Sequence, residues 1–158
     1  MVATPANARY VIRDWLDKAG TTVQNSPIAS FVFNYIVTIN GRKISIGQEI
    51  EKQSYLTLSA SLVFTDEDNR TLESAQGGRE AVTKGMKIAL AAVKMSYTGI
   101  GVPLQKVVVA KSAFIGDGLL EHEVMAAMFD VEAAFNLVLE IATVPRSEPP
   151  KQSSQSVP

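Results

Sequence analysis

The side chain most able to do acid–base or metal chemistry is His122, the one histidine of the chain. Glu121 and Glu123 flank it at the start of a predicted helix. A general base needs a substrate or nucleophile within hydrogen-bond reach, and helical neighbours at i−1 and i+1 point away from it. A histidine beside a single carboxylate also falls short of the three or four protein ligands that a zinc site uses. We therefore interpret His122 as a surface residue among helix N-terminal acids.

A second cluster, Asp66-Glu67-Asp68, invites a calcium interpretation because carboxylate oxygens are the ligands that this ion prefers. An EF-hand loop needs glycine at its sixth position and glutamate at its twelfth. Counted from Asp66, those positions hold Thr71 and Gly77. We interpret the acids as a solvated turn that ends a strand and caps the next segment of the chain.

Gly99 and Gly101 resemble a phosphate-binding loop only in their spacing. Phosphate loops lie between a strand and a helix, whereas this glycine pair follows a predicted helix and leads into a strand. The chain has no cysteine, which excludes disulfides, thiolate metal ligands and cysteine nucleophiles. The nucleophile-elbow, zinc-protease and kinase motifs are absent as well. The sequence thus predicts a protein that is not an enzyme, with no catalytic, cofactor-binding or metal-binding residues.

The net charge and the hydropathy of the chain argue against nucleic acid and membrane as binding partners. The chain has 158 residues, a formal net charge of -1 and a sequence pI near 5.8, so it offers no long-range attraction to nucleic acid or anionic lipid. No stretch approaches the roughly 20 apolar residues of a membrane span, and the N-terminus does not resemble a signal peptide. We expect a cytoplasmic protein that binds neither nucleic acid nor membrane.

The strongest structural signal is an antiparallel meander of three strands between Ala29 and Thr65. Aromatic and β-branched residues alternate from Phe31 to Ile39, which is typical of a half-buried strand. Asn40 and Gly41 suit a type I′ two-residue hairpin because both central positions need positive φ. That turn predicts the register Ile39 with Arg42, Val37 with Ile44, Tyr35 with Ile46, Phe33 with Gln48 and Phe31 with Ile50.

The third strand of the meander alternates strictly between apolar and hydroxyl side chains. One face carries Leu56, Leu58, Ala60, Leu62 and Phe64, and the other carries Thr57, Ser59 and Ser61. Before the meander, Thr4 and Pro5 indicate the start of a helix that carries the single Trp15, and Gly20 ends it. We expect Trp15 to anchor this helix on the sheet, with a short strand near Thr22 and Val23.

A helical turn or two from Thr71 to Gln76, a break at Gly77 and a longer helix from Arg79 to Tyr97 come after the meander. The long helix is rich in small residues, and Gly85 costs roughly 1 kcal/mol of helix propensity relative to alanine. Such a cost indicates a close contact at that point. The sequence leaves open whether the contact is internal or with a second subunit.

The chain then forms a fourth strand from Gln105 to Ile115, a Gly116-Asp117-Gly118 turn and a last helix from Leu120 to Ala142. The segment 146–158 is rich in Pro, Ser and Gln, which predicts a disordered polar tail. We expect a single α+β domain over residues 1–145, with the helices packed on one face of the sheet.

This order of elements resembles the type III secretion chaperone-like domains, including the YbjN-like proteins. The resemblance covers roughly residues 5 to 143. It rests on the segments Ile12-Arg13-Asp14-Trp15-Leu16, Phe31-Val32-Phe33, Asp117-Gly118-Leu119-Leu120 and Phe129-Asp130-Val131. It implies an α+β fold, a tendency to homodimerise and non-enzymatic binding of a protein segment.

Two functions are therefore expected. The first is a chaperone-like or regulatory module that captures a polypeptide segment of another protein on exposed strand edges or apolar grooves. The alternative is a small-ligand or lipid-binding domain with a cavity between the sheet and the small-residue helix.

The predicted dimer or partner interface combines the small-residue helix with the fourth strand, which would be an edge of a four-stranded sheet with few charged residues or prolines to block pairing. Its candidate residues are Gly85, Ala89, Ala92, Val108 and Ala110.

Overall fold

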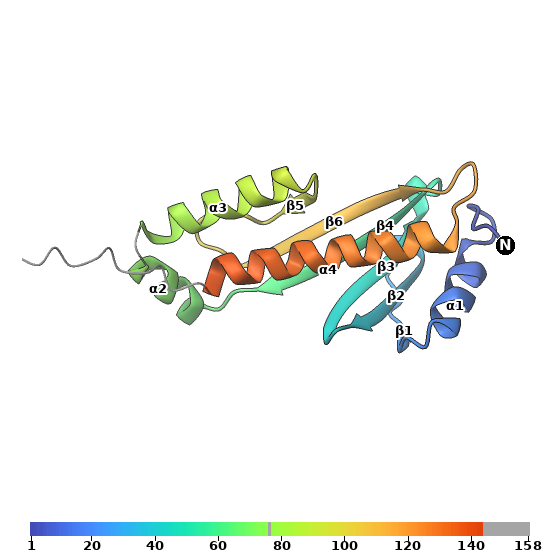
Figure 1. The fold of residues 1–158 in the computed structure, drawn as a ribbon, viewed down its shortest axis with the longest axis horizontal. Coiled ribbons are helices and arrows are strands. Elements are labelled where there is room, and N and C mark those ends of the chain that lie inside the picture. Colours follow the sequence, from blue (N-terminus) through green and yellow to red (C-terminus); the bar gives the residue numbers. More distant parts are fainter. Residues whose placement is uncertain (76, 144–158) are drawn as a thin grey trace, which may run out of the picture.

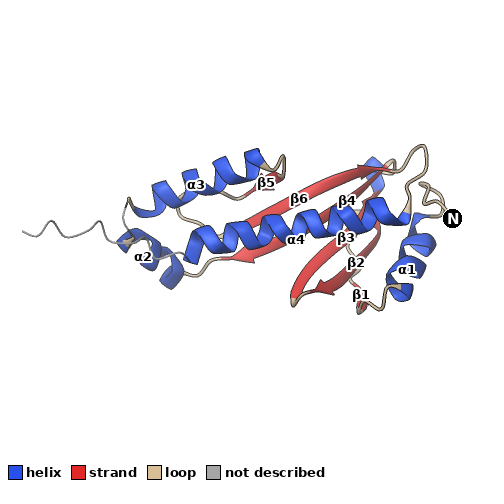
Figure 2. Ribbon diagram, viewed as in Figure 1, coloured by secondary structure: helices blue, strands red, loops and turns tan. Residues whose placement is uncertain are grey.

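The computed structural model describes residues 1–75 and 77–143 and confirms the α+β class. Helices pack against one antiparallel sheet, as Figures 1 and 2 show. The predicted tail at 146–158 lies outside the described residues. The elements in chain order are α1 (Ala8–Lys18), β1 (Val23–Asn25), β2 (Phe31–Ile39), β3 (Arg42–Glu49), the 3₁₀ turn η1 (Ile50–Lys52), β4 (Tyr55–Val63), α2 (Asp66–Ser74), α3 (Gly78–Ala92), β5 (Ser96–Thr98), β6 (Lys106–Phe114) and α4 (Glu121–Thr143).

The sheet has six strands in the order β1-β2-β3-β4-β6-β5, where the sequence predicted four with a short extra one near Val23. β1 pairs with β2, so that short strand is confirmed. β5 was missed because its residues were assigned to the end of the preceding helix. It pairs with Val108–Ala110, so the prediction that the fourth strand is a sheet edge is wrong over its central residues.

The hairpin between β2 and β3 has the predicted turn. Asn40 and Gly41 both adopt positive φ, 49° and 76°. The register is confirmed for the pairs nearest the turn: Ile39 with Arg42, Val37 with Ile44, Tyr35 with Ile46 and Phe33 with Gln48.

The register prediction is wrong at the far end of the hairpin, where Phe31 pairs with Glu49 instead of Ile50. A β-bulge between Phe31 and Phe33 places an extra residue in β2, which shifts the pairing by one. The ring of Phe31 lies over Gly47, where a β-carbon would stand only 2.5 Å from a ring atom. Only glycine leaves room for the ring at that position.

Three helix boundaries also differ from the predictions. α1 begins after Asn7 because Thr4 and Pro5 form a preceding turn, in which the Thr4 amide donates to Asn7 Oδ1 at 2.7 Å. Trp15 is buried in the core, as expected. α2 begins at Asp66, so the acids predicted as a turn form the first helical turn. α3 ends at Ala92 because Lys94 takes a left-handed φ of 55°, which turns the chain into β5.

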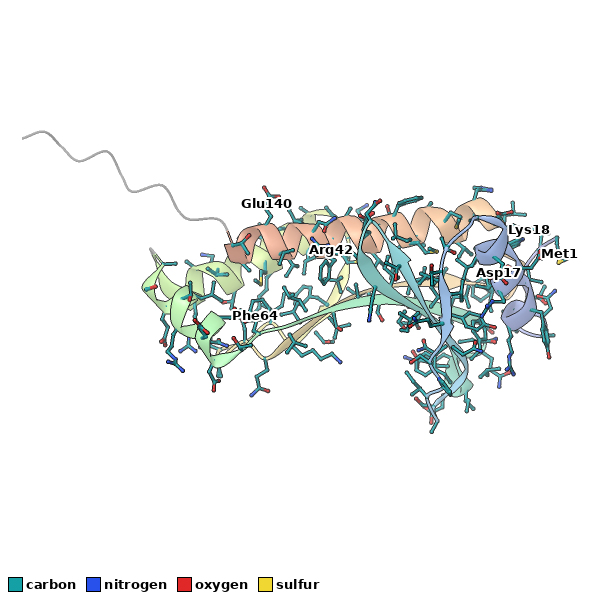
Figure 3. The ribbon with its side chains drawn as sticks, turned by 90° about the horizontal axis from the view of Figure 1, so that it is seen from below. Met1, Asp17, Lys18, Arg42, Phe64 and Glu140 are labelled. Atoms are coloured by element: carbon teal, nitrogen blue, oxygen red, sulfur yellow. The ribbon has the colours of Figure 1, made fainter. Side chains whose placement is uncertain are left out.

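The core lies between the sheet and the helices. Along β3, β4 and β6, one set of alternating side chains is buried, including Ile46, Leu58 and Val109. α4 contacts β3, β4 and β6 and lies along the length of the sheet (Figure 3). Two hydrogen bonds join the tip of the β2–β3 hairpin to α4. The Asn40 side-chain amide donates to Glu132 Oε1 at 2.9 Å, and Arg42 Nε donates to Asn136 Oδ1 at 3.1 Å.

Gly47→Ala is expected to destabilise the fold by about 1–3 kcal/mol, because the new methyl group would overlap the Phe31 ring and the Asn34 side chain. In the double variant Gly47→Ala/Phe31→Ala, the alanine at position 47 should cost less free energy of unfolding than it does in wild type, because the ring that it would overlap is gone. Chemical denaturation monitored by circular dichroism measures both free energies of unfolding.

Gly101→Ala is the matched control, because no atom lies within 4 Å of the position that its new methyl group would take and its φ is ordinary. It should change the free energy of unfolding by less than about 1 kcal/mol. Equal effects of the two glycine substitutions would show that Phe31 does not pack on Gly47.

Candidate functional site

His122, the acidic cluster at residues 66–68 and the glycine pair at 99 and 101, which were considered for acid–base, metal and phosphate chemistry, belong to different parts of the fold. His122 is exposed in the first turn of α4, as expected from the sequence. Within residues 1–75 and 77–143, no three His, Cys, Asp or Glu side chains are grouped so that they could hold a metal ion. None of the helices in these ranges is long and apolar enough to span a membrane.

Of the acids at residues 66–68, Asp68 takes part in the cap of α2, so the predicted capping role is confirmed for this residue. The Thr65 amide donates to Asp68 Oδ2 at 2.7 Å, and the Asp68 amide donates to Thr65 Oγ1 at 3.1 Å. This reciprocal pair satisfies two amides at the helix start. The hydrogen bond from the Thr65 amide stabilises the ionised carboxylate and lowers the pKa of Asp68.

The five predicted interface residues do not form one surface. Gly85 faces α4, where an added β-carbon would meet Ile141 Cγ2 at 3.6 Å, so its close contact is internal. Val108 and Ala110 alternate with the buried Val107 and Val109, which places them on the side of the sheet opposite the helices. The two groups, Gly85, Ala89 and Ala92 on α3 and Val108 and Ala110 on β6, therefore lie in different layers. Their role in a dimer stays a prediction.

The side of the sheet that carries Val108 and Ala110 has none of the described helices packed on it; we call its outward side chains the open face. Cross-strand pairing places Ser45 beside Ser59, and Ser59 beside Ala110. These positions are half-buried or exposed, and they lack charge. The central residues of the open face are Ile36, Ser45, Thr57, Ser59, Ser61, Val108, Ala110 and Ser112.

An aromatic pair stands at one end of the open face. Tyr55 and Phe114 lie opposite each other on β4 and β6, with ring centroids 5.3 Å apart and planes inclined at 61°. Their exposed fractions are 44% and 48%. Phe114 also covers Gly116, where a β-carbon would stand 2.3 Å from the ring. Packing on both sides holds the rings in place although they are exposed.

The sheet edges offer less surface than the open face. β1 and β5, the outermost strands, have three residues each. Short edge strands present few unpaired backbone groups to another chain. The expectation that a partner is captured on strand edges therefore has weaker structural support than binding across the open face.

A hollow of about 320 Å³ lies where β4 ends, between α2 and α4. Its apolar lining residues include Leu62, Phe64, Leu72 and Leu139, and its polar ones are Asp68, Thr71 and Thr143. Figure 3 shows Phe64 on the sheet side of α4, whereas Glu140 points away from it. The sequence predicted a cavity against the small-residue helix, but the walls of this hollow are α2 and α4.

A family model for uncharacterized conserved proteins, DUF2299, matches residues 8–142. The chain belongs to this family. The matched range runs from the first residue of α1 almost to the end of α4, so it includes every helix and strand described above. No curated protein matches the chain.

Two solved structures are similar to this chain. An uncharacterized protein from Methanothermobacter thermautotrophicus is similar with a TM-score of 0.76 and 19% sequence identity, over 85% of this chain and 95% of that protein. YbjN from E. coli is similar with a TM-score of 0.41 and 15% identity, over 82% of this chain and 87% of that protein. At 19% identity, the Methanothermobacter structure shows a shared fold.

Asp68→Asn is expected to lower the melting temperature at neutral pH, because the capping carboxylate is lost. The pKa of Asp68 is lowered in the folded state, so its stabilising effect is present above the ordinary value of 3.8 and disappears as the pH falls through the folded value. The difference from wild type should therefore shrink in acid. Thermal unfolding over a pH series measures it.

Asp66→Asn is the control, since Asp66 lies in the same turn but takes no part in the capping box. A loss of stability with Asp66→Asn equal to that with Asp68→Asn would indicate a general effect of helix charge instead of the cap.

Proposed function

We propose that this protein is a non-enzymatic protein-binding module and that it binds its partner on the open face. The observation that carries the proposal is the uncharged centre of this face, formed by Ser59, Ala110 and their neighbours on β3, β4 and β6. Charged side chains are depleted in the buried centres of protein interfaces because their desolvation is costly.

The aromatic pair supports the same proposal. Tyr and Phe are enriched at interfaces, since each buries a large apolar area while losing little conformational freedom. Tyr55 and Phe114 are held in place by one another and by Gly116, so a partner that packs on them need not order them first. The serine, threonine and alanine side chains beside them are short, so a polypeptide segment can lie close to the sheet.

The nearest charges to this face are Lys43 and Lys106, at flanking positions of β3 and β6, and Glu49, whose carboxylate accepts a hydrogen bond from Thr57 at 3.1 Å beside the aromatic pair. A neutral centre with charged ends is the arrangement of an interface core and its rim. A chaperone-like role, as in the type III secretion chaperone-like domains that the sequence resembles, would be one form of this function, and it stays a prediction.

Photo-cross-linking in the native host tests the proposal. A photoreactive phenylalanine analogue at position 55 or 114 should give the same covalent polypeptide adduct, because both side chains stand together on the open face. Ala110→Arg should abolish the adduct from both positions while the circular dichroism spectrum stays that of wild type, since it places a charge at the centre of the face.

The analogue at position 10 is the control. Tyr10 is 73% exposed on α1, outside the open face, and should not give that adduct. The proposal fails if positions 55 and 114 give no polypeptide adduct, or if the adduct persists in Ala110→Arg.

A second candidate function is small-ligand or lipid binding in the hollow beside Phe64 and Leu139. The hollow, at about 320 Å³, is within the range of small-molecule sites, roughly 300–1,000 Å³, and its walls are mainly apolar. An apolar ligand with an uncharged or basic polar end would suit this lining, because Asp68, Thr71 and Thr143 supply its polar groups.

Native mass spectrometry of protein purified from its host tests this second function. A ligand should appear as a mass above that of the chain and should be lost with Leu139→Trp, because the larger side chain fills the hollow. Ile88→Trp, on the exposed side of α3, should retain the ligand. A wild-type mass equal to that of the chain alone would contradict the ligand-binding function.

A further inference from the structure

β6 extends beyond β5, the short strand that pairs with its outer edge. β5 pairs with Val108–Ala110 only, although β6 continues to Phe114. Just before β5, the Lys94 and Met95 amides donate to carbonyl groups at the end of α3, at 3.1 and 3.0 Å, so the chain leaves the edge of β6 at this point. Figure 1 shows β6 continuing past the ends of α3 and β5. We call the last part of β6, residues 111–114, the free edge.

The backbone groups of Ser112 and Phe114 point outward along the free edge. In an antiparallel pair, every second residue exchanges hydrogen bonds with the strand on one side. The Ile115 amide donates to the Ser54 carbonyl at 2.8 Å, so the odd-numbered residues of β6 bond to β4 and the even-numbered ones face the other way. Among the described residues, no backbone group bonds to Ser112 or Phe114 from this outer side.

The free edge also lacks the features that normally prevent a strand from pairing with another chain, such as outward charges and prolines. Its one charged residue is Lys111, whose side chain turns to the helix layer and pairs with Asp130 of α4. Ser112 and Phe114 are both exposed. Unpaired N–H and C=O groups at strand spacing match the hydrogen-bonding groups of another extended chain.

We propose that the free edge binds an extended segment of the partner protein, which pairs with β6 as an additional strand in line with β5. This inference rests on the proposed function, because the added strand widens the open face on which the partner binds. Its side chains opposite Ser112 and Phe114 lie on the open face. The one opposite Phe114 stands beside the aromatic pair, where aromatic and β-branched side chains form favourable cross-strand contacts. The segment therefore carries an aromatic or β-branched residue at that position.

A phage-displayed library of linear peptides of about ten residues, the length of a long strand, is the probe, and it is selected on the full-length protein. The selected peptides should bind Ser112→Pro about tenfold or more weakly, because proline lacks the N–H and its ring fills the outer side of the strand. The variant should keep the circular dichroism spectrum of wild type, since the Ser112 amide faces away from β4. Ser112→Ala is the matched control, because it keeps the amide and should bind the peptides as wild type does.

N-methylation of a selected peptide gives a readout that needs no variant of the protein. Methyl groups on the peptide amides that face β6 should abolish binding, whereas methyl groups on the intervening amides should be tolerated. The losses should therefore recur at every second residue of the peptide. Contacts made by side chains alone predict no such period.

Hydrogen exchange of the free protein, measured by NMR, tests whether the edge is open. The Ser112 and Phe114 amides should exchange rapidly, whereas the Val108 and Ala110 amides, which lie in the part of β6 paired with β5, should exchange more slowly. Equal protection of all four amides would show that another part of the chain or a second copy covers the edge, and it would overturn the proposal.

The outcomes separate strand addition from the proposed function. Peptides that bind Ser112→Pro as tightly as wild type, or that show no period of two on N-methylation, overturn strand addition. If Ala110→Arg nevertheless weakens these peptides, binding on the open face is supported without it. A library that yields no binding peptide also overturns strand addition, whereas cross-linking from positions 55 and 114 still decides the proposed function.

Discussion

The structure depends on one constraint, namely that the sheet has a single apolar face. Because side chains alternate along a strand, Leu56, Leu58 and Ala60 of β4 all point to one side, and Thr57, Ser59 and Ser61 to the other. β3 and β6 follow the same division. Helices gain stability only by covering the apolar side. The opposite side is therefore left open along the sheet, and its small hydroxyl side chains form a surface of uncharged groups.

Much of this arrangement could be predicted from local sequence. The Asn40-Gly41 turn specified the register of the first hairpin, and the alternation in β4 identified both faces. The bulge at Phe31 could not be predicted, because it depends on the packing of that ring over Gly47. β5 was missed because Ser96 and Tyr97 were included in the preceding helix, and a strand of three residues is too short to show an alternating pattern, although Tyr and Thr favour strands. Tyr55 and Phe114 were also missed as a pair, since β4 and β6 are separated by two helices.

The two sides of the protein differ in chemistry. The centre of the open face is neutral and rich in hydroxyl groups, with an aromatic pair at one end. The outer surface of α3 and α4 exposes Ile88 and Phe129 and carries both basic and acidic side chains, among them Lys84 and Glu140. A neutral face does not select its partner by charge.

Hydroxyl-radical footprinting of the free protein tests the one-sided sheet most directly, because aromatic side chains on the two faces report solvent access separately. Tyr55 and Phe114 on the open face should be oxidised rapidly, whereas Phe33 and Tyr35, buried beneath the helices, should be protected. Protection of Tyr55 and Phe114 equal to that of Phe33 and Tyr35 would show that the supposed open face is covered and would contradict this account.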